Sequence, residues 1–167
     1  FLGIHFGISG TPLRGRLVNL IGEKAFRGLF ALASIAGLIW LIRAYSTAPY
    51  IRTWGRLIVL DPLAPPLMLV AALFVVVGIS TPSPTTAGME SQLTRGVQVR
   101  GITRITRHPF LWGVALWAFV HFVINGDVAA ALVFGSLLLL SVVGTSSIDA
   151  KRRHAYGERW EHFSRET

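Results

Sequence analysis

The sequence RITRHPF (Arg104–Phe110) runs without a break into the apolar segment LWGVALWAFVHFVI (Leu111–Ile124), which stops at Asn125-Gly126-Asp127. Two arginines, a histidine and a proline stand where a membrane helix would begin. His121 lies thirteen residues beyond His108, roughly 20 Å deeper in a hydrocarbon layer about 30 Å thick. Ionisable side chains at that depth are costly and usually face a bundle interior or a site. We therefore expect a spanning helix whose histidine has a structural or functional partner.

The composition is that of a protein whose solvent is lipid. Hydrophobic residues make up 52% of the 167 residues and charged residues only 14%, and the mean hydropathy is +0.56, above the balance of a soluble domain. The chain has no cysteine, so ligation of a metal or haem would fall to histidine. The net charge of +8 comes from basic residues that punctuate apolar runs. This pattern indicates anchoring to the lipid bilayer, and we expect no nucleic-acid binding.

The apolar runs predict an all-α, polytopic membrane bundle that forms a single domain over residues 1–167. We expect about five transmembrane helices and a C-terminal amphipathic helix that starts at Ile148 and lies on the membrane. The first span would be the end of a helix cut short at Phe1, and Pro62, Pro65 and Pro66 should delay or kink the third. The expected spans are Phe1–Ser9, Ala25–Ile42, Leu57–Ser80, His108–Asn125 and Val128–Thr145.

The distribution of basic residues predicts the orientation of these spans. If the spans alternate, Arg43, Arg52 and Arg56 lie on one side of the membrane, and the other thirteen of the 16 Lys and Arg residues lie on the opposite side. Positive charge favours the cytoplasmic side. We therefore expect the amino terminus to face out and the carboxyl terminus to face the cytoplasm.

Three histidines belong to membrane segments: His5, His108 and His121. His5 is flanked by glycines, which allow a neighbouring helix or a flat ligand to approach; it is either a packing residue or a ligand. His121 is either a neutral imidazole bonded to a carbonyl or part of a site. Trp117 lies four residues before it, so both side chains share one helix face, which we expect to look inward.

His108 differs from the other two because it stands at the start of its helix, before a proline at the first helical position. It is either a capping residue that contacts lipid headgroups or part of an anion or cofactor-phosphate site with Arg104 and Arg107. His108 and His121 are about 140° apart around their helix, so they should not converge on one atom. His154 and His162 are expected to be solvated on the amphipathic tail.

The sequence offers little for other chemistries. We find no buried nucleophile with a base, no paired carboxylates on one helix face and no glycine loop that cradles phosphate, so hydrolysis is not expected. The sequence contains no internal repeat of the kind that many membrane carriers have, so a carrier is not favoured. The polar stretch Thr81–Gln98 predicts a loop of unusual length that could cover a site.

Four motifs carry a resemblance to a known family: HFGIS at 5–9, ITRHPFLWG at 105–113, SIDAKRR at 147–153 and YGERW at 156–160. Together they resemble the NnrU family of bacterial membrane proteins, which is linked to denitrification. That family is similar to the plant and cyanobacterial zeta-carotene isomerase, which uses haem b to isomerise a cis double bond. The resemblance implies a protein of the bacterial inner membrane that acts on a hydrophobic substrate such as a carotenoid or works within a membrane redox complex.

The same resemblance implies the ligands of the cofactor. Carried over from the isomerase, His5 and His121 would ligate haem b, with Trp117 packed on the macrocycle. The isomerase has a cysteine where this chain has Ala118, so ligand exchange through a thiolate is not expected. By helix rise His5 lies about 13 Å from the inner surface and His121 roughly 20 Å, so tilt must close the gap, or else His5 pairs with His108.

A more distant similarity is to isoprenylcysteine and phospholipid methyltransferases, which share the Arg-His-Pro helix start and a tail like YGERW. In those enzymes the histidine of this motif helps to hold S-adenosylmethionine, which would give that role to His108 with Arg107. The tail here begins Ser147-Ile148-Asp149, with one acidic residue where those enzymes have a pair. The alternatives to a haem protein are thus a membrane methyltransferase and a non-catalytic subunit of a redox complex.

Overall fold

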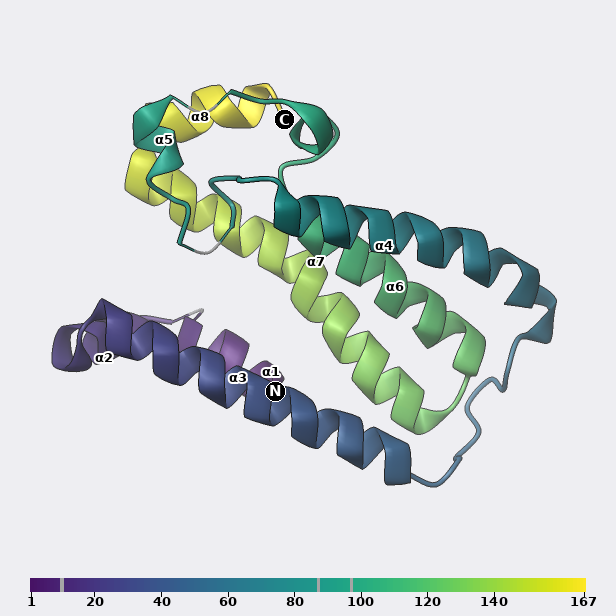
Figure 1. Cartoon of the computed structure of the whole chain (residues 1–167). Coiled ribbons are helices and arrows are strands. Elements are labelled where there is room, and N and C mark those ends of the chain that lie inside the picture. The colour runs from purple at the N-terminus through teal and green to yellow at the C-terminus, as the bar shows by residue number, and fades with distance from the viewer. Residues whose placement is uncertain (10, 87, 97) are drawn as a thin grey trace.

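The computed structural model describes residues 1–9, 11–86, 88–96 and 98–167, and within these ranges the regular elements are helices (Figure 1). The expected all-α class is therefore confirmed. In chain order the elements are α1 (Leu2–Ile4), η1 (His5–Ser9), α2 (Leu13–Ile21), α3 (Glu23–Thr47), η2 (Ile58–Leu63), α4 (Ala64–Ser80), α5 (Gln92–Arg95), η3 (Gly101–Arg104), α6 (Pro109–Asn125), α7 (Val128–Tyr156) and α8 (Glu158–Arg165).

Three helical segments are long and apolar enough to cross a membrane: Glu23–Thr47, Ile58–Ser80 and Val128–Tyr156. The apolar helix α6 is shorter, with 17 residues. Three to four long apolar helices make this a multi-pass membrane protein by length and composition. Residues 1–9 form the short helices α1 and η1, so a fifth span stays a prediction.

The prolines act as expected at the start of the Ile58–Ser80 segment. Residues 58–63 form a 3₁₀ turn with Pro62 inside it, and α4 then begins at Ala64 with Pro65 and Pro66 in its first turn. A proline there lacks only an N–H that has no intrahelical partner anyway. The α-helix therefore starts several residues later than the apolar run does.

The helices form two units of different density. Helices α4, α6 and α7 lie side by side in what we call the bundle, whereas α1, η1, α2 and α3 form an N-terminal unit whose long helix α3 runs apart from it (Figure 1). Glycines bring the bundle helices close, because a Cβ at Gly113 would lie 2.8 Å from the Ala71 carbonyl oxygen and a Cβ at Gly78 would lie 2.6 Å from the Phe110 nitrogen. In α3 only Phe26 is buried.

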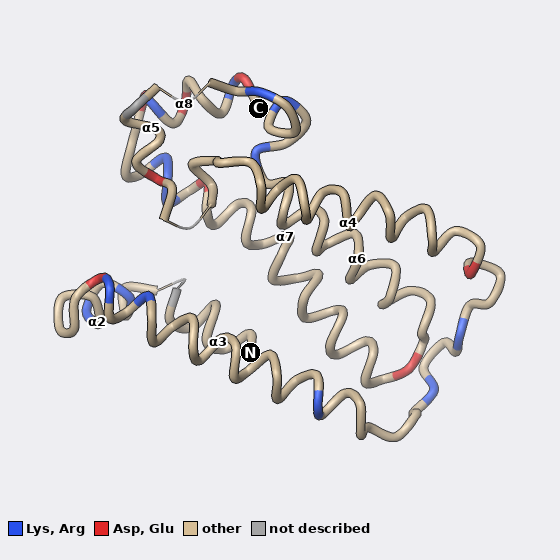
Figure 2. The backbone as a smooth tube through the Cα atoms, in the orientation of Figure 1, with Lys and Arg blue, Asp and Glu red and all other residues tan. Residues whose placement is uncertain are grey.

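Backbone hydrogen bonds join the loop that follows α3 to the end of α6 and its turn into α7, at what we call the turn end. The nitrogens of Thr53 and Gly55 donate to the Gly126 carbonyl at 3.0 and 2.9 Å, and Leu57 N donates to Ile124 O at 3.0 Å. The opposite, charged end holds most of the lysines and arginines (Figure 2). This separation of charge along the helices is what the sequence predicted.

The carboxyl-terminal part corrects one expectation. Helix α7 continues without a break to Tyr156, and a new helix begins only after Gly157, whose φ is +50°. The expected amphipathic helix from Ile148 is therefore wrong in its start, because no proline or positive-φ glycine interrupts residues 128–156. Trp160, with 0% of its surface exposed, and Phe163 of α8 pack against Leu93, and the position of this helix on the membrane stays a prediction.

Candidate functional site

The Arg-His-Pro segment forms a compact polar cluster with α7. Asp149, on α7, accepts a hydrogen bond at 2.6 Å from Nε2 of His108, and its Oδ2 is 3.0 Å from Nε and 2.5 Å from Nη2 of Arg107. The His108 side chain is 4% exposed and the Asp149 side chain 15%. The fork of the Arg107 guanidinium matches the carboxylate geometry. One acidic residue thus satisfies both basic side chains.

The long loop before α6 covers this cluster, as the sequence suggested, although its residues 87 and 97 lie outside the described ranges. The Thr85 hydroxyl donates to the Arg107 carbonyl oxygen at 2.5 Å and lies 2.9 Å from the Ser83 hydroxyl. The guanidinium of Arg107 also stands 5.9 Å from the Trp160 ring, within the range of a cation–π interaction. The loop and α8 therefore shield the cluster from both sides.

The electrostatics of the cluster favour a neutral imidazole. Burial lowers the pKa of His108 from its ordinary 6.5, the hydrogen bond and charge of Asp149 raise it, and the charge of Arg107 lowers it, with a net shift downward. A neutral His108 donates its Nε2 hydrogen to the carboxylate and leaves Arg107 as the cation that pairs with Asp149. The sequence suggested either a helix-capping residue or part of an anion site. His108 is the N-cap residue of α6, and the anion beside it is the Asp149 carboxylate of the same chain.

Asp149 is the member of this cluster that the sequence did not place. Its motif, Ser147-Ile148-Asp149, marked it as one acidic residue where methyltransferases have two, yet we expected it on the cytoplasmic tail. The number of residues in α7 could have located it. Because α6 and α7 run antiparallel from the turn at Gly126, Asp149 near the end of α7 lies level with the start of α6. Arg104, the last residue of η3, is exposed.

A large apolar cavity lies between the N-terminal unit and the bundle, with a volume of about 740 Å³. His5 and Trp117 both line it, together with Phe134 from α7. The Nδ1 atom of His5 is 3.2 Å from the Phe1 carbonyl oxygen, and its ring lies 5.3 Å from that of Phe30, edge to face. The remaining lining residues are mostly aliphatic: Phe1, Phe6, Leu38, Leu41, Ile42, Tyr45, Phe110, Leu111, Val114, Val133, Leu137, Leu140, Ser141, Gly144, Ser147, Ile148 and Lys151.

His121 lies beside this cavity and is not among the described residues that line it. Its ring stacks on Phe134, with centroids 4.6 Å apart and planes 16° apart, and lies 5.1 Å from the Trp117 ring. The expected proximity of Trp117 and His121 is therefore present. His5 and Phe134 line the cavity and His121 does not, and ligation of a cofactor by His5 together with His121 stays a prediction. Ala118 is fully buried against Ala130 and Phe134.

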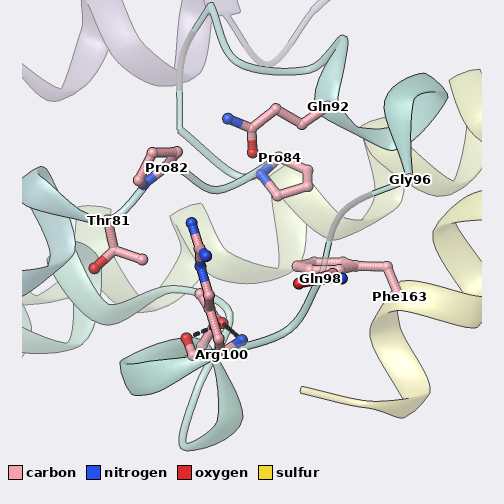
Figure 3. Close-up of a pocket in the computed structure, with 9 residues that line it drawn as sticks. Thr81, Pro82, Pro84, Gln92, Gly96, Gln98, Arg100 and Phe163 are labelled. Atoms are coloured by element: carbon pink, nitrogen blue, oxygen red, sulfur yellow. Dashed lines mark hydrogen bonds between the residues drawn. The ribbon is translucent and has the colours of Figure 1, made fainter.

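A third group of side chains lies on the far side of the loop. A pocket of about 380 Å³ is enclosed by the loop, η3 and Phe163 of α8. Figure 3 shows the Arg100 side chain extending from η3 toward Pro82 and Pro84. None of the residues that the sequence singled out as ligands lines this pocket.

Comparison with known proteins accounts for the whole chain. No curated protein and no solved structure matches it. The model of one protein family, described as NnrU protein, matches residues 1–167, including the Arg-His-Pro segment, the loop that covers it and the helix that carries Asp149. The chain belongs to the NnrU family.

Proposed function

We propose that this NnrU protein binds haem b in the apolar cavity, with the imidazole of His5 as an axial ligand. The observation that carries the proposal is the imidazole of His5 in the wall of a cavity lined mainly by aromatic and aliphatic side chains, with Tyr45, Ser141, Ser147 and Lys151 as its other polar lining residues. Its volume of about 740 Å³ is in the range of sites that bury a drug-sized or cofactor-sized ligand. The donor set fits haem, because histidine is a common axial ligand of its iron.

The hydrogen bond of His5 supports this role. An Nδ1–H that donates to the Phe1 carbonyl fixes both the tautomer and the ring, and leaves Nε2 as the nitrogen able to coordinate. Histidines that bind metals usually donate their other ring nitrogen to a carbonyl or a carboxylate in this way. Coordination would also compensate an imidazole for the water it loses in a membrane.

The other walls would orient a flat ligand. Trp117 and Phe134 present aromatic rings 5.2 Å apart and at 72° to each other, and the aliphatic residues of α3 and α7 exclude water. Bound haem would supply an iron centre able to carry an electron or bind a small gas molecule, which suits the link of the family to denitrification. The chain itself supplies ligation, orientation and a dry environment.

The role of His121 as a second ligand stays a prediction. Its ring stacks on Phe134, which lines the cavity, and His121 is not itself among the described lining residues. His108, the other partner considered for His5, is committed to Asp149 at 2.6 Å. Haem held by His5 alone would keep one axial position open to an external ligand.

The methyltransferase alternative draws no support from the cluster. Arg107 and His108 are the residues that would hold S-adenosylmethionine, and both bind Asp149. A carotenoid-like substrate and a membrane redox complex stay predictions, and so does the orientation in the bacterial inner membrane. The concentration of basic residues at the end opposite the turn end supports a cytoplasmic location for that end (Figure 2).

The test is an absorption spectrum of the protein purified in detergent and supplied with haem b. We expect a Soret band that His5→Ala abolishes. The matched control is His162→Ala, since that side chain is 80% exposed on α8 and should leave the band unchanged. His121→Ala decides between one and two histidine ligands. A wild-type protein that folds normally and binds no haem would overturn the proposal.

A further inference from the structure

A second cavity, of about 720 Å³, lies at the charged end between the N-terminal unit and α7. Four basic side chains line it: Arg14 and Arg27 from the N-terminal unit, and Lys151 and Arg152 from α7. Glu90 is the acidic residue in its wall. We call this space the basic cavity, and we propose that it binds the headgroup of an anionic phospholipid of the surrounding bilayer.

The three arginines of the basic cavity are held in place by two acidic residues, Glu23 and Glu90. Arg152 donates to the Pro84 carbonyl oxygen and to Glu90, both at 3.0 Å, and Arg14 donates to Glu23 at 2.7 Å. Arg27 is paired with Glu23 and approaches Glu90 at 3.9 Å. Four cationic and two anionic side chains leave a net formal charge of +2. Lys151 is within electrostatic range of both Arg14 and Arg152, so an added anion would relieve repulsion between like charges.

Part of the remaining wall of the basic cavity is apolar, beside the hydroxyl groups of Thr11 and Thr85. Phe26, Phe30 and Ala31 contribute the apolar part from α3, and Ile148 and Ala155 from α7. The cavity also shares Ile148 and Lys151 with the apolar cavity that contains His5. A ligand that fits both halves of the wall has an anionic group next to hydrocarbon, which is the chemistry of a phospholipid at the level of its phosphate and glycerol.

The position of the basic cavity favours a lipid over a free anion. It lies where Arg27 precedes the apolar part of α3 and where Lys151 and Arg152 follow the apolar part of α7, which is where the interface of a bilayer around these helices would lie. Basic pockets between membrane helices on the cytoplasmic side bind acidic lipid headgroups. Inorganic phosphate would use the cationic side chains and gain nothing from Phe26, Phe30 and Ile148.

Such a lipid would join the two units of the protein. Its phosphate would contact Arg14 on one side and Lys151 or Arg152 on the other, so binding would bring together charges that otherwise repel. A ligand that binds only the assembled form stabilises it in proportion to its concentration and affinity. The lipid would therefore act as a structural partner at the charged end, where the described residues of the two units share no backbone hydrogen bond.

The experiment compares two lipids on the full chain, delipidated in neutral detergent and examined by native mass spectrometry. The probes are phosphatidylglycerol, which is anionic, and phosphatidylcholine, which carries the same phosphate but no net charge. We expect the wild-type protein to retain phosphatidylglycerol preferentially. Each lost cation should weaken retention about fivefold, given roughly 1 kcal/mol per basic residue near a charged lipid.

Matched variants locate the effect. Arg14→Gln and Lys151→Gln each remove one charge from the basic cavity, whereas Arg16→Gln removes the same charge from the same helix as Arg14 but does not line the cavity. Equal retention of the two lipids by the wild type, or an equal loss in Arg16→Gln, would overturn the proposal. Displacement of phosphatidylglycerol by millimolar inorganic phosphate would reduce the cavity to a simple anion site and would overturn it too. The result does not depend on haem, because His5→Ala should retain the lipid.

Discussion

The helices of the bundle pack closely against one another, whereas those of the N-terminal unit pack loosely. In the bundle, α4 and α6 approach so closely at Gly78 and Gly113 that a methyl group at either position would meet backbone atoms. In the N-terminal unit, a Cβ at Gly28 would meet no heavy atom within 4 Å, and large residues of α3 such as Leu32 and Trp40 are 66% and 68% exposed. Close packing drives association between membrane helices. The bundle is therefore the rigid part of the molecule.

This difference explains where the cavities lie. The two large ones, at about 740 and 720 Å³, are both bounded by the N-terminal unit on one side and by α7 on the other. The polar cluster at Asp149, by contrast, lies inside the bundle and is filled by its own side chains. The bundle thus forms the rigid scaffold, and the cavities that could hold ligands lie where the N-terminal unit faces it. This difference between the two units can be measured directly.

The largest effect is expected from Asp149→Ala in the bundle. The substitution leaves the partly buried Arg107, whose side chain is 28% exposed, without its carboxylate and removes the acceptor of the buried His108, which should cost about 3 kcal/mol of unfolding free energy, the lower end of the range for a buried pair. The matched substitution in the N-terminal unit is Glu23→Ala, whose pairs with Arg14 and Arg27 are 37–52% exposed and should be worth under about 1 kcal/mol. Unfolding by titration with a denaturing detergent measures both. Similar losses in the two variants would show that the units do not differ.

The next effect comes from adding one methyl group to each unit. Gly113→Ala forces a Cβ against Ala71 O and Val75 N, both at 2.8 Å, and should destabilise the protein by about 1–3 kcal/mol because backbone must move. Gly28→Ala meets open space and should be neutral or slightly stabilising. The same detergent titration is the measurement. A harmless Gly113→Ala would contradict the close approach of α4 and α6.

The smallest effect is a pH dependence that arises in the cluster. Burial lowers the pKa of His108 in the folded protein, where Asp149 and Arg107 face it, so below pH 6.5 the unfolded chain binds a proton that the folded chain does not. Stability should therefore fall as the pH drops from 7 through 6.5, by at most about 1.4 kcal/mol per pH unit for one proton. Unfolding midpoints at pH 7.5 and 5.5 measure it. His108→Gln should reduce the loss and His162→Gln should not.

The membrane class, the helical content and the start of α6 were predictable because each depends on local sequence. Apolar runs fix the spans, and Pro109 after His108 fixes where α6 begins. The end of α7 was missed because the switch from an apolar to a charged composition near Ile148 resembles a boundary, although helix geometry continues unchanged until a glycine interrupts it. Charge changes the environment of a helix, and only backbone signals end it.

The candidate site was predictable in its residues but not in its contacts. His5 and Trp117 were singled out and both line one cavity, yet whether Phe134 or His121 lines that cavity depends on how α6 rotates against α7. The pairing of His108 with Asp149 spans 41 residues of sequence, and the basic cavity combines Arg14 with Arg152 across the whole chain. Such contacts depend on tertiary packing, which periodicity and composition do not determine.

The backbone hydrogen bonds at Gly126 also determine how the molecule can move. They join the loop that follows α3 to the turn between α6 and α7, and salt does not weaken them. The opposite end is held by ion pairs, which Arg152 and Arg27 both form with Glu90. Any rotation of α3 away from α7 must therefore pivot at the turn end and open widest at the charged end. High ionic strength should loosen only that end, so a bulky ligand would enter and leave from there while every backbone hydrogen bond at the pivot stays intact.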